Sequence, residues 1–321
     1  MMMFSVPYND KAAEWYCKKQ SPICKDIIKD ELKKTTNADE INFLNDVQSS
    51  LEILLKGKPK ALLDIQNYFS EKYGMNSDDP YGGSEYFCDV TNKIFNYAKL
   101  SGNKEFAYEL AKKIGVTICP YCNREFINTI VIEESEESRS KCEISRPEFD
   151  HFFPKSKYPL LALSYYNLIP SGHICNSSIK HDRELDINTH IHPYIKDSND
   201  VFNFRSELTG MKDGYSQYKI DIATESEKVR NTFDFFYLRD IYQSHIDIVE
   251  RIYEIYNKYP DGEFRRLVEY FKKFDMPIVE TEEDLLNILY SEFIIKDADK
   301  EILGKLKQDM YLEILQLYDL D

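Results

Sequence analysis

Cysteine and histidine concentrate in one short stretch of the chain, where their spacing could bind a metal ion. Cys119 and Cys122 form a C-x-x-C pair, and a tight turn can direct both sulfurs of such a pair onto one Zn²⁺. A tetrahedral structural site needs two further nitrogen or sulfur donors. Cys175 is one such donor, and His173 lies two residues before it. We therefore expect a structural Zn²⁺ held by Cys119, Cys122, His173 and Cys175.

The fourth zinc ligand is the least regular part of this pattern. A second C-x-x-C pair ending at Cys175 would begin at position 172, which is Gly172. His173 is the ligand that we favour in its place. Cys142, His181 or a turn that binds no metal are the alternatives.

The Cys-Pro-Tyr-Cys sequence also resembles the active dithiol of glutaredoxins. In that fold the dithiol follows a first strand and begins a helix. Here a long helical region precedes Cys119 and a strand-like run follows Cys122. A dithiol oxidoreductase and a pair of ordinary buried cysteines are therefore alternatives to zinc.

Four polar residues follow the cysteine pair. Asp150 and His151 lie in a mixed polar and aromatic run that predicts a strand ending at Pro154. Successive side chains of a strand point to opposite faces. These two can therefore act on one group only where the strand twists or ends. Asn167 lies 16 residues after His151, and Asn176 lies nine residues further on.

Three segments in this stretch resemble the HNH endonuclease family, which has the ββα-metal fold. They read CPYCNR at 119–124, DHFFPKSKYP at 150–159 and YNLIPSGHICNSS at 166–178. The likeness covers about 116–180, roughly a fifth of the chain. With its helical flanks, the chain is most similar to the HNH nucleases of Septu-type and retron-associated phage-defence systems.

The resemblance implies a role for each matching residue. His151 matches the general base that takes a proton from water, and Asn167 matches the residue that fixes the loop and orients the histidine. Asp150 and Asn176 match the ligands of one catalytic Mg²⁺ or Mn²⁺. The family often has histidine where this chain has Asn176, and an amide oxygen suits Mg²⁺ better than an imidazole does. The implied activity is hydrolysis of DNA phosphodiester bonds in bacterial defence, with an ATPase partner.

The charge of the chain limits how it could bind DNA. The 41 basic and 56 acidic side chains give a net charge of −15, which argues against a broad basic DNA-binding surface. Between Arg146 and Arg183, five basic and three acidic side chains give a local charge of +2. Lys155 and Lys157 follow the expected strand and are the predicted phosphate contacts. The net acidity suggests that a partner delivers the DNA.

The pattern of apolar residues predicts an α+β protein in three parts. Residues 1–112 are expected to be helical, 113–196 to form the zinc-stapled ββα-metal module, and 197–321 to form a β-hairpin followed by helices. The hairpin is expected around 202–204 and 218–222. One helical stripe in the first part consists of Leu44, Val47, Leu51, Leu54 and Leu55.

Several classes of protein are disfavoured by the sequence. We find no run of the ~20 apolar residues that a membrane-spanning helix needs, and the first residues lack the pattern of a secretory signal. Seven cysteines in a chain without an export signal argue against a disulfide framework. We expect a soluble cytoplasmic protein. A zinc-stabilised interaction module without catalysis is the main alternative to a nuclease.

Overall fold

The computed structural model describes residues 5–134, 140–273 and 279–318 of the chain. It is an α+β protein, in which helices are accompanied by small antiparallel sheets. The chain divides into two compact units. Among the described residues, the N-terminal unit comprises 5–121 and 125–196, and the C-terminal unit comprises 122–124 and 197–273 with 279–318.

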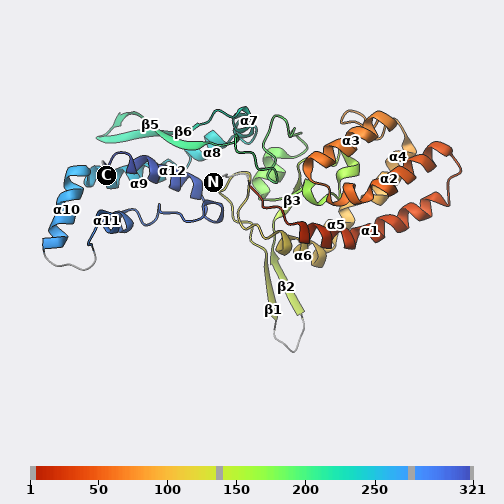
Figure 1. Ribbon diagram of the computed structural model, residues 1–321, viewed down its shortest axis with the longest axis horizontal. Coiled ribbons are helices and arrows are strands. Elements are labelled where there is room, and N and C mark those ends of the chain that lie inside the picture. Colours follow the sequence, from red (N-terminus) through yellow and green to blue (C-terminus); the bar gives the residue numbers. More distant parts are fainter. Residues whose placement is uncertain (1–4, 135–139, 274–278, 319–321) are drawn as a thin grey trace. The chain divides into compact units, whose positions relative to one another are not determined.

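The N-terminal unit begins with a set of helices, as expected for 1–112 (Figure 1). They are α1 (Asp10–Leu32), α2 (Ala38–Lys56), α3 (Pro59–Tyr73), α4 (Glu85–Ile94), α5 (Tyr97–Gly102) and α6 (Lys104–Ile114). A side-chain oxygen that accepts from the first turn caps five of them, from Asn9, Asn37, Ser84, Asn96 and Asn103. These caps explain where the helices begin.

Helix α2 buries the apolar stripe that the sequence predicts. Leu44, Val47, Leu54 and Leu55 are fully buried, and Leu51 is nearly so. The stripe packs α2 against α1 and α3. Burying each such side chain favours folding by about 1.5–3 kcal/mol. The stripe therefore holds α2 firmly against its two neighbouring helices.

Two small sheets follow the helices in the same unit. Strands β1 (Ile130–Glu134) and β2 (Ser140–Ser145) form a hairpin that extends away from the helices (Figure 1). Strand β3 (Glu148–His151) pairs antiparallel with β4 (Leu168–Ser171), so that Asp150 lies opposite Ile169 and His151 opposite Leu168. The π-helix η3 (Ile174–Lys180) comes after β4. The order strand, strand, helix is therefore present between 148 and 180.

A long connection joins β3 to β4. It contains two short 3₁₀ turns, η1 (Pro159–Leu161) and η2 (Tyr165–Asn167). Most of its side chains are buried. We refer to residues 152–167 as the β3–β4 loop.

The C-terminal unit contains the predicted hairpin, which is longer than the sequence pattern indicated (Figure 1). Strands β5 (Asn203–Lys212) and β6 (Tyr215–Ala223) are joined by Asp213 and Gly214, both with positive φ. An Asp-Gly pair is the usual sequence for this kind of tight turn. The helices are α7 (Glu227–Phe235), α8 (Leu238–Gln243), α9 (Ile246–Lys258), α10 (Asp261–Lys273), α11 (Glu282–Leu289) and α12 (Gly304–Leu315), with the 3₁₀ turn η4 (Ala298–Lys300).

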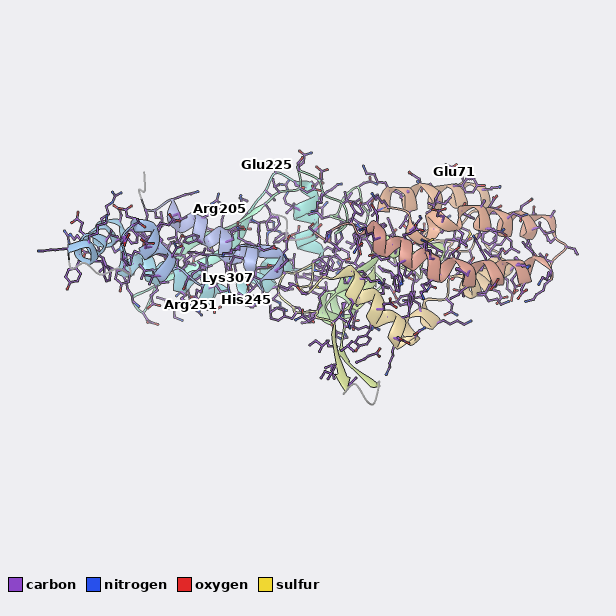
Figure 2. The ribbon with its side chains drawn as sticks, turned by 60° about the horizontal axis from the view of Figure 1, so that its bottom comes forward. Glu71, Arg205, Glu225, His245, Arg251 and Lys307 are labelled. Carbon is purple, nitrogen blue, oxygen red and sulfur yellow. The ribbon has the colours of Figure 1, made fainter. Side chains whose placement is uncertain are left out.

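Helices α9 and α12 contact the β5–β6 hairpin. Figure 2 labels Arg205 on β5, Arg251 on α9 and Lys307 on α12. Arg251 pairs with Glu292 at 2.9 Å, so part of the basic charge of this unit is neutralised locally.

Among the described helices, none combines the length and apolar character needed to cross a bilayer.

Candidate metal and catalytic site

A cavity of about 470 Å³ lies beside β3 and η3 in the N-terminal unit. Four of the residues predicted from the sequence line it: Asp150, His151, Lys155 and Asn176. Asn167 and Lys157 are not among the lining residues. The full lining consists of Tyr97, Arg146, Glu148, Phe149, Asp150, His151, Pro154, Lys155, Asn176, Ser177, His181 and Asp182.

His151 ends β3, and its imidazole is held in one tautomer. Its Nε2 lies 2.9 Å from the carbonyl oxygen of Ala162. Because a carbonyl can only accept, Nε2 carries the proton and the lone pair is left on Nδ1. The ring makes a T-shaped contact with Tyr97, at a centroid distance of 4.4 Å. Burial lowers the pKa of His151 to about 3, so the ring is neutral at physiological pH and can act as a base.

Asn167 is fully buried and fixes the β3–β4 loop by three hydrogen bonds. Its Oδ1 accepts from the backbone N–H of Phe153 at 2.7 Å. Its Nδ2 donates to the carbonyl oxygens of Phe153 and Leu161, both at 3.0 Å. Leu161 immediately precedes Ala162, the partner of His151. Asn167 therefore positions the loop that holds the histidine.

The β3–β4 loop is also attached to the helices of its unit. The Tyr16 hydroxyl of α1 donates to the carbonyl oxygen of Leu163 at 2.9 Å. The Ser164 hydroxyl donates to the carbonyl oxygen of Leu54 at the end of α2. Helices α1 and α2 thus hold the two residues that follow Ala162, and through them the orientation of the His151 ring.

Asp150 is almost completely buried, with an exposed fraction of 2%. The Tyr121 hydroxyl donates to its Oδ2 at 2.7 Å, and the Lys180 ammonium lies 3.0 Å from its Oδ1. Lys180 also donates to the carbonyl oxygen of His151 at 2.6 Å. Burial raises the pKa of Asp150, although Lys180 and Tyr121 oppose this shift. Both carboxylate oxygens are therefore already bonded to protein groups.

Asn176 is turned toward Glu148 rather than toward Asp150. Its Nδ2 donates to Glu148 Oε2 at 2.8 Å, and the Ser177 hydroxyl donates to the same oxygen at 2.8 Å. Burial alone would raise the pKa of Glu148, but the bonds from His173, Ser177 and Asn176 outweigh it and lower the pKa. Glu148 is thus a second carboxylate at the cavity, and a more exposed one than Asp150.

The structure does not place His173, the predicted fourth zinc ligand, with the three cysteines. Its side chain is 68% exposed, and Nδ1 lies 2.8 Å from Glu148 Oε1. The Glu148 carboxylate raises the pKa of His173. The alternatives Cys142 and His181 are also outside the cysteine group. Gly172 and His173 lie just before η3, and Cys175 lies within it. Of these three residues, Cys175 is the one that belongs to the cysteine group.

The three remaining predicted zinc ligands do come together. The sulfur atoms of Cys119, Cys122 and Cys175 lie within 4.8 Å of one another, and all three residues are buried. Zinc about 2.3 Å from each sulfur requires sulfurs roughly 3.8 Å apart in a tetrahedron, which is compatible with this grouping. Of the seven cysteines, all in the described part of the chain, none forms a disulfide. The cluster could therefore hold a metal ion.

The local fold of the C-x-x-C turn explains this convergence. Ile118 and Phe126 form an antiparallel bridge, and the N–H of Cys119 donates to the carbonyl oxygen of Glu125 at 2.9 Å. Asn123 takes a positive φ of 49°, which lets the chain reverse within a few residues. Between the two cysteines, Tyr121 reaches the Asp150 carboxylate, so the turn is tied to the cavity.

The two predicted phosphate contacts differ in their positions. Lys155 lines the cavity, and its ammonium lies 5.9 Å from the centre of the Tyr97 ring. Lys157 instead forms an ion pair with Glu184 at 2.8 Å, and this carboxylate raises the pKa of Lys157. The structure therefore brings Lys155, but not Lys157, to the cavity.

Sequence reasoning missed Glu148, Tyr121 and Lys180 as parts of this site. A signal for Glu148 was available, because residues two apart on a strand share a face and Asp150 is two residues further on. Lys180 lies four residues after Asn176, which places both on one side of a single helical turn. No comparable pattern points to Tyr121, whose contact with Asp150 depends on the turn.

We expect replacement of Asn167 by leucine to destabilise the N-terminal unit. The substitution leaves the Phe153 N–H and the Phe153 carbonyl oxygen without their Asn167 partners, whereas the Leu161 carbonyl oxygen still accepts from the Ser164 N–H. Because each unsatisfied buried group costs about 1–3 kcal/mol, the free energy of unfolding should fall by at least about 2 kcal/mol. Urea titration followed by Trp15 fluorescence measures it, because Trp15 is the single tryptophan and lies on α1.

The matched control is Asn45→Leu on α2, where the side chain is exposed. This variant should change the unfolding free energy by no more than about 0.5 kcal/mol. Equal stabilities for the two variants would show that Asn167 does not hold the β3–β4 loop.

We expect Lys180→Met to lower the stability of the N-terminal unit by about 3–5 kcal/mol, because it removes the cation from a buried carboxylate. The double variant Asp150→Asn with Lys180→Met should lose less, because the uncompensated charge is also removed. The same fluorescence titration compares the single and double variants. A double variant that loses as much stability as Lys180→Met, or more, would contradict the coupling of the two side chains.

The His151 ring should remain neutral from pH 8 to about pH 4, with the proton on Nε2. Because its folded-state pKa lies below the value near 6.5 of an unfolded chain, this residue's contribution to stability is lost as the pH falls from 6.5 toward 3. Nitrogen NMR shifts of labelled histidine report both the tautomer and the titration.

His173 provides an internal comparison in the same spectra. It should titrate above pH 6.5, and Glu148→Gln should lower its pKa. A His151 signal that titrates near pH 6.5 would contradict the burial described here.

Comparisons with known proteins add no assignment: no protein-family model, no curated protein and no solved structure matches this chain. The interpretation of the site therefore rests on its residues and their geometry.

Proposed function

We propose that the N-terminal unit is a metal-dependent endonuclease of the HNH type that hydrolyses DNA phosphodiester bonds. The observation that carries the proposal is the shared cavity: His151, Asp150 and Asn176 line it together. They come from β3 and η3 in a strand, strand, helix order, which is the order that a ββα-metal module requires. The resemblance in sequence described above supports the same conclusion independently of the coordinates.

In the proposed reaction His151 is the general base. Its Nδ1 lone pair takes a proton from water as the water oxygen attacks phosphorus and the bond from phosphorus to the 3′ oxygen breaks. The leaving oxygen then acquires a proton from solvent. General-base catalysis of this kind contributes about 10²–10⁴-fold to the rate. The hydrogen bond to Ala162 keeps the proton of the neutral ring on Nε2, so that Nδ1 is the nitrogen that accepts the proton from water.

The residues around the cavity fit a hard divalent cation such as Mg²⁺ or Mn²⁺ in part. Glu148, Asp150 and the amide oxygen of Asn176 are oxygen donors of the kind that Mg²⁺ prefers. When bound, the ion would act as a Lewis acid on the phosphate and on the leaving oxygen. Asp150 is not an open ligand, because Lys180 lies on its Oδ1. A cation that uses Asp150 therefore competes with the Lys180 ammonium.

In this proposal the cysteine cluster is structural. A zinc ion on Cys119, Cys122 and Cys175 would fix the C-x-x-C turn against the start of η3. Tyr121 lies within that turn and bonds to Asp150, so a fixed turn would also fix the carboxylate beside the catalytic base.

The partner and the biological setting follow from the resemblance. We propose that the nuclease acts in the bacterial cytoplasm in defence against phage, together with an ATPase subunit. The net charge of −15 supports delivery of DNA by another subunit, because an acidic protein repels the phosphate backbone at long range. Lys155 is the basic residue that we place on the substrate phosphate.

A second function, a zinc-stabilised interaction module without catalysis, is favoured by one observation. Both oxygens of Asp150 are already bonded, to Tyr121 and Lys180, as they would be in a purely structural carboxylate. The nuclease is favoured instead by the position of His151, which lines the same cavity as Asp150 and Asn176.

The proposal predicts that the purified protein nicks supercoiled plasmid DNA with Mg²⁺ or Mn²⁺ and that His151→Ala reduces the rate by at least about 10²-fold, the lower end of what a general base contributes. Gel separation of nicked and supercoiled forms measures the rate. His190→Ala is the control, because this histidine is not among the cavity-lining residues.

Equal nicking by the wild type and His151→Ala would remove His151 from the mechanism. An absence of cleavage by the wild type with either ion would favour the interaction module. Rapid plasmid degradation by the protein alone at physiological salt would contradict the need for a partner that delivers the DNA.

A further inference from the structure

The position of the missing fourth cysteine is occupied by a carboxylate. At Gly172, where a second C-x-x-C pair would place its first cysteine, an added β-carbon would lie 1.9 Å from Glu125 Oε2 and 2.3 Å from Glu125 Cδ. The carboxylate group of Glu125 thus fills the space in which the cysteine side chain would begin. Its Oε2 is also buried from solvent.

The backbone places Glu125 next to the cysteine cluster. Its carbonyl oxygen accepts from the Cys119 N–H at 2.9 Å, so Glu125 is paired across the turn with the first ligand. Gly172 lies three residues before Cys175, the third ligand. Glu125 is therefore held between the two segments that supply the sulfurs.

We propose that Glu125 supplies the fourth ligand of the metal centre, an oxygen, and that Gly172 is glycine because this carboxylate needs its space. Zinc accepts carboxylate oxygen at about 2.0–2.2 Å. Three thiolates and one carboxylate carry the same charge as four thiolates, whereas histidine or water in the fourth position would leave one negative charge fewer. The inference rests on the proposed zinc site but not on nuclease activity.

The group within 4.8 Å consists of the three sulfurs. In the proposed centre the Glu125 carboxylate would therefore move closer to them by rotation about its side-chain bonds. A water molecule is the competing fourth ligand, as in zinc sites with only three protein ligands.

Zinc affinity and cobalt spectra of the whole 321-residue chain test the proposal. Glu125→Ala should lower zinc affinity, measured by competition with a chromophoric chelator, by at least about tenfold, the lower end of what loss of a supporting carboxylate costs. The cobalt derivative should change its visible d–d bands, which report the donor set. Glu207→Gln, an exposed carboxylate on β5, should change neither.

A rescue variant separates loss of a ligand from loss of folding. Gly172→Cys with Glu125→Ala creates a four-cysteine site and should restore zinc affinity, with stronger thiolate-to-cobalt charge transfer than the wild type. Unchanged affinity and spectrum in Glu125→Ala would overturn the proposal, and so would a wild-type protein that retains no zinc after dialysis. None of these readouts involves DNA cleavage, so the nuclease proposal stands or falls separately.

Discussion

The buried carboxylate of Asp150 imposes the strongest constraint on the N-terminal unit. A charged group taken out of water is tolerated only where opposite charge and hydrogen-bond donors surround it. The donors here come from two distant segments: Tyr121 from the C-x-x-C turn and Lys180 from the end of η3. Satisfying one carboxylate therefore fixes the turn, the strand and the helix together. The cysteine cluster joins the same turn to the beginning of the same helix, so the two interactions support each other at opposite ends of η3.

His151, the proposed general base, depends on a different set of contacts, which begin in the N-terminal helices. Tyr16 and Leu54 hold the residues after Ala162, and Ala162 holds the imidazole. This explains why the first helices and most of the region 113–196, which are distinct in sequence pattern, belong to one compact unit. The helices do not contribute a side chain that reacts in the proposed mechanism. They hold the mostly buried β3–β4 loop in place, so that the Ala162 carbonyl oxygen meets His151 Nε2.

The parts of the structure that follow local rules could be predicted from the sequence. The stripe from Leu44 to Leu55 and the hairpin around Gly214 follow periodicity and turn chemistry, and three cysteines of the cluster follow from spacing. Spacing alone could not show that the His173 ring pairs with Glu148, a carboxylate 25 residues away. Nor could it show that Lys157 pairs with Glu184, 27 residues further along the chain. Both contacts concern competition between charged side chains, which only the folded chain decides.

The same competition determines how positive the cavity can be. Lys180 is bound to Asp150 and Lys157 to Glu184, so two of the five basic side chains between Arg146 and Arg183 are neutralised in place. Lys155 and Arg146 remain at the cavity, where Glu148, Asp150 and Asp182 also lie. A phosphate entering such a site meets nearly balanced charge. In the proposed reaction, attraction for the substrate must then come from the bound divalent cation, and an acidic chain with this arrangement would bind nucleic acid weakly until that cation is present.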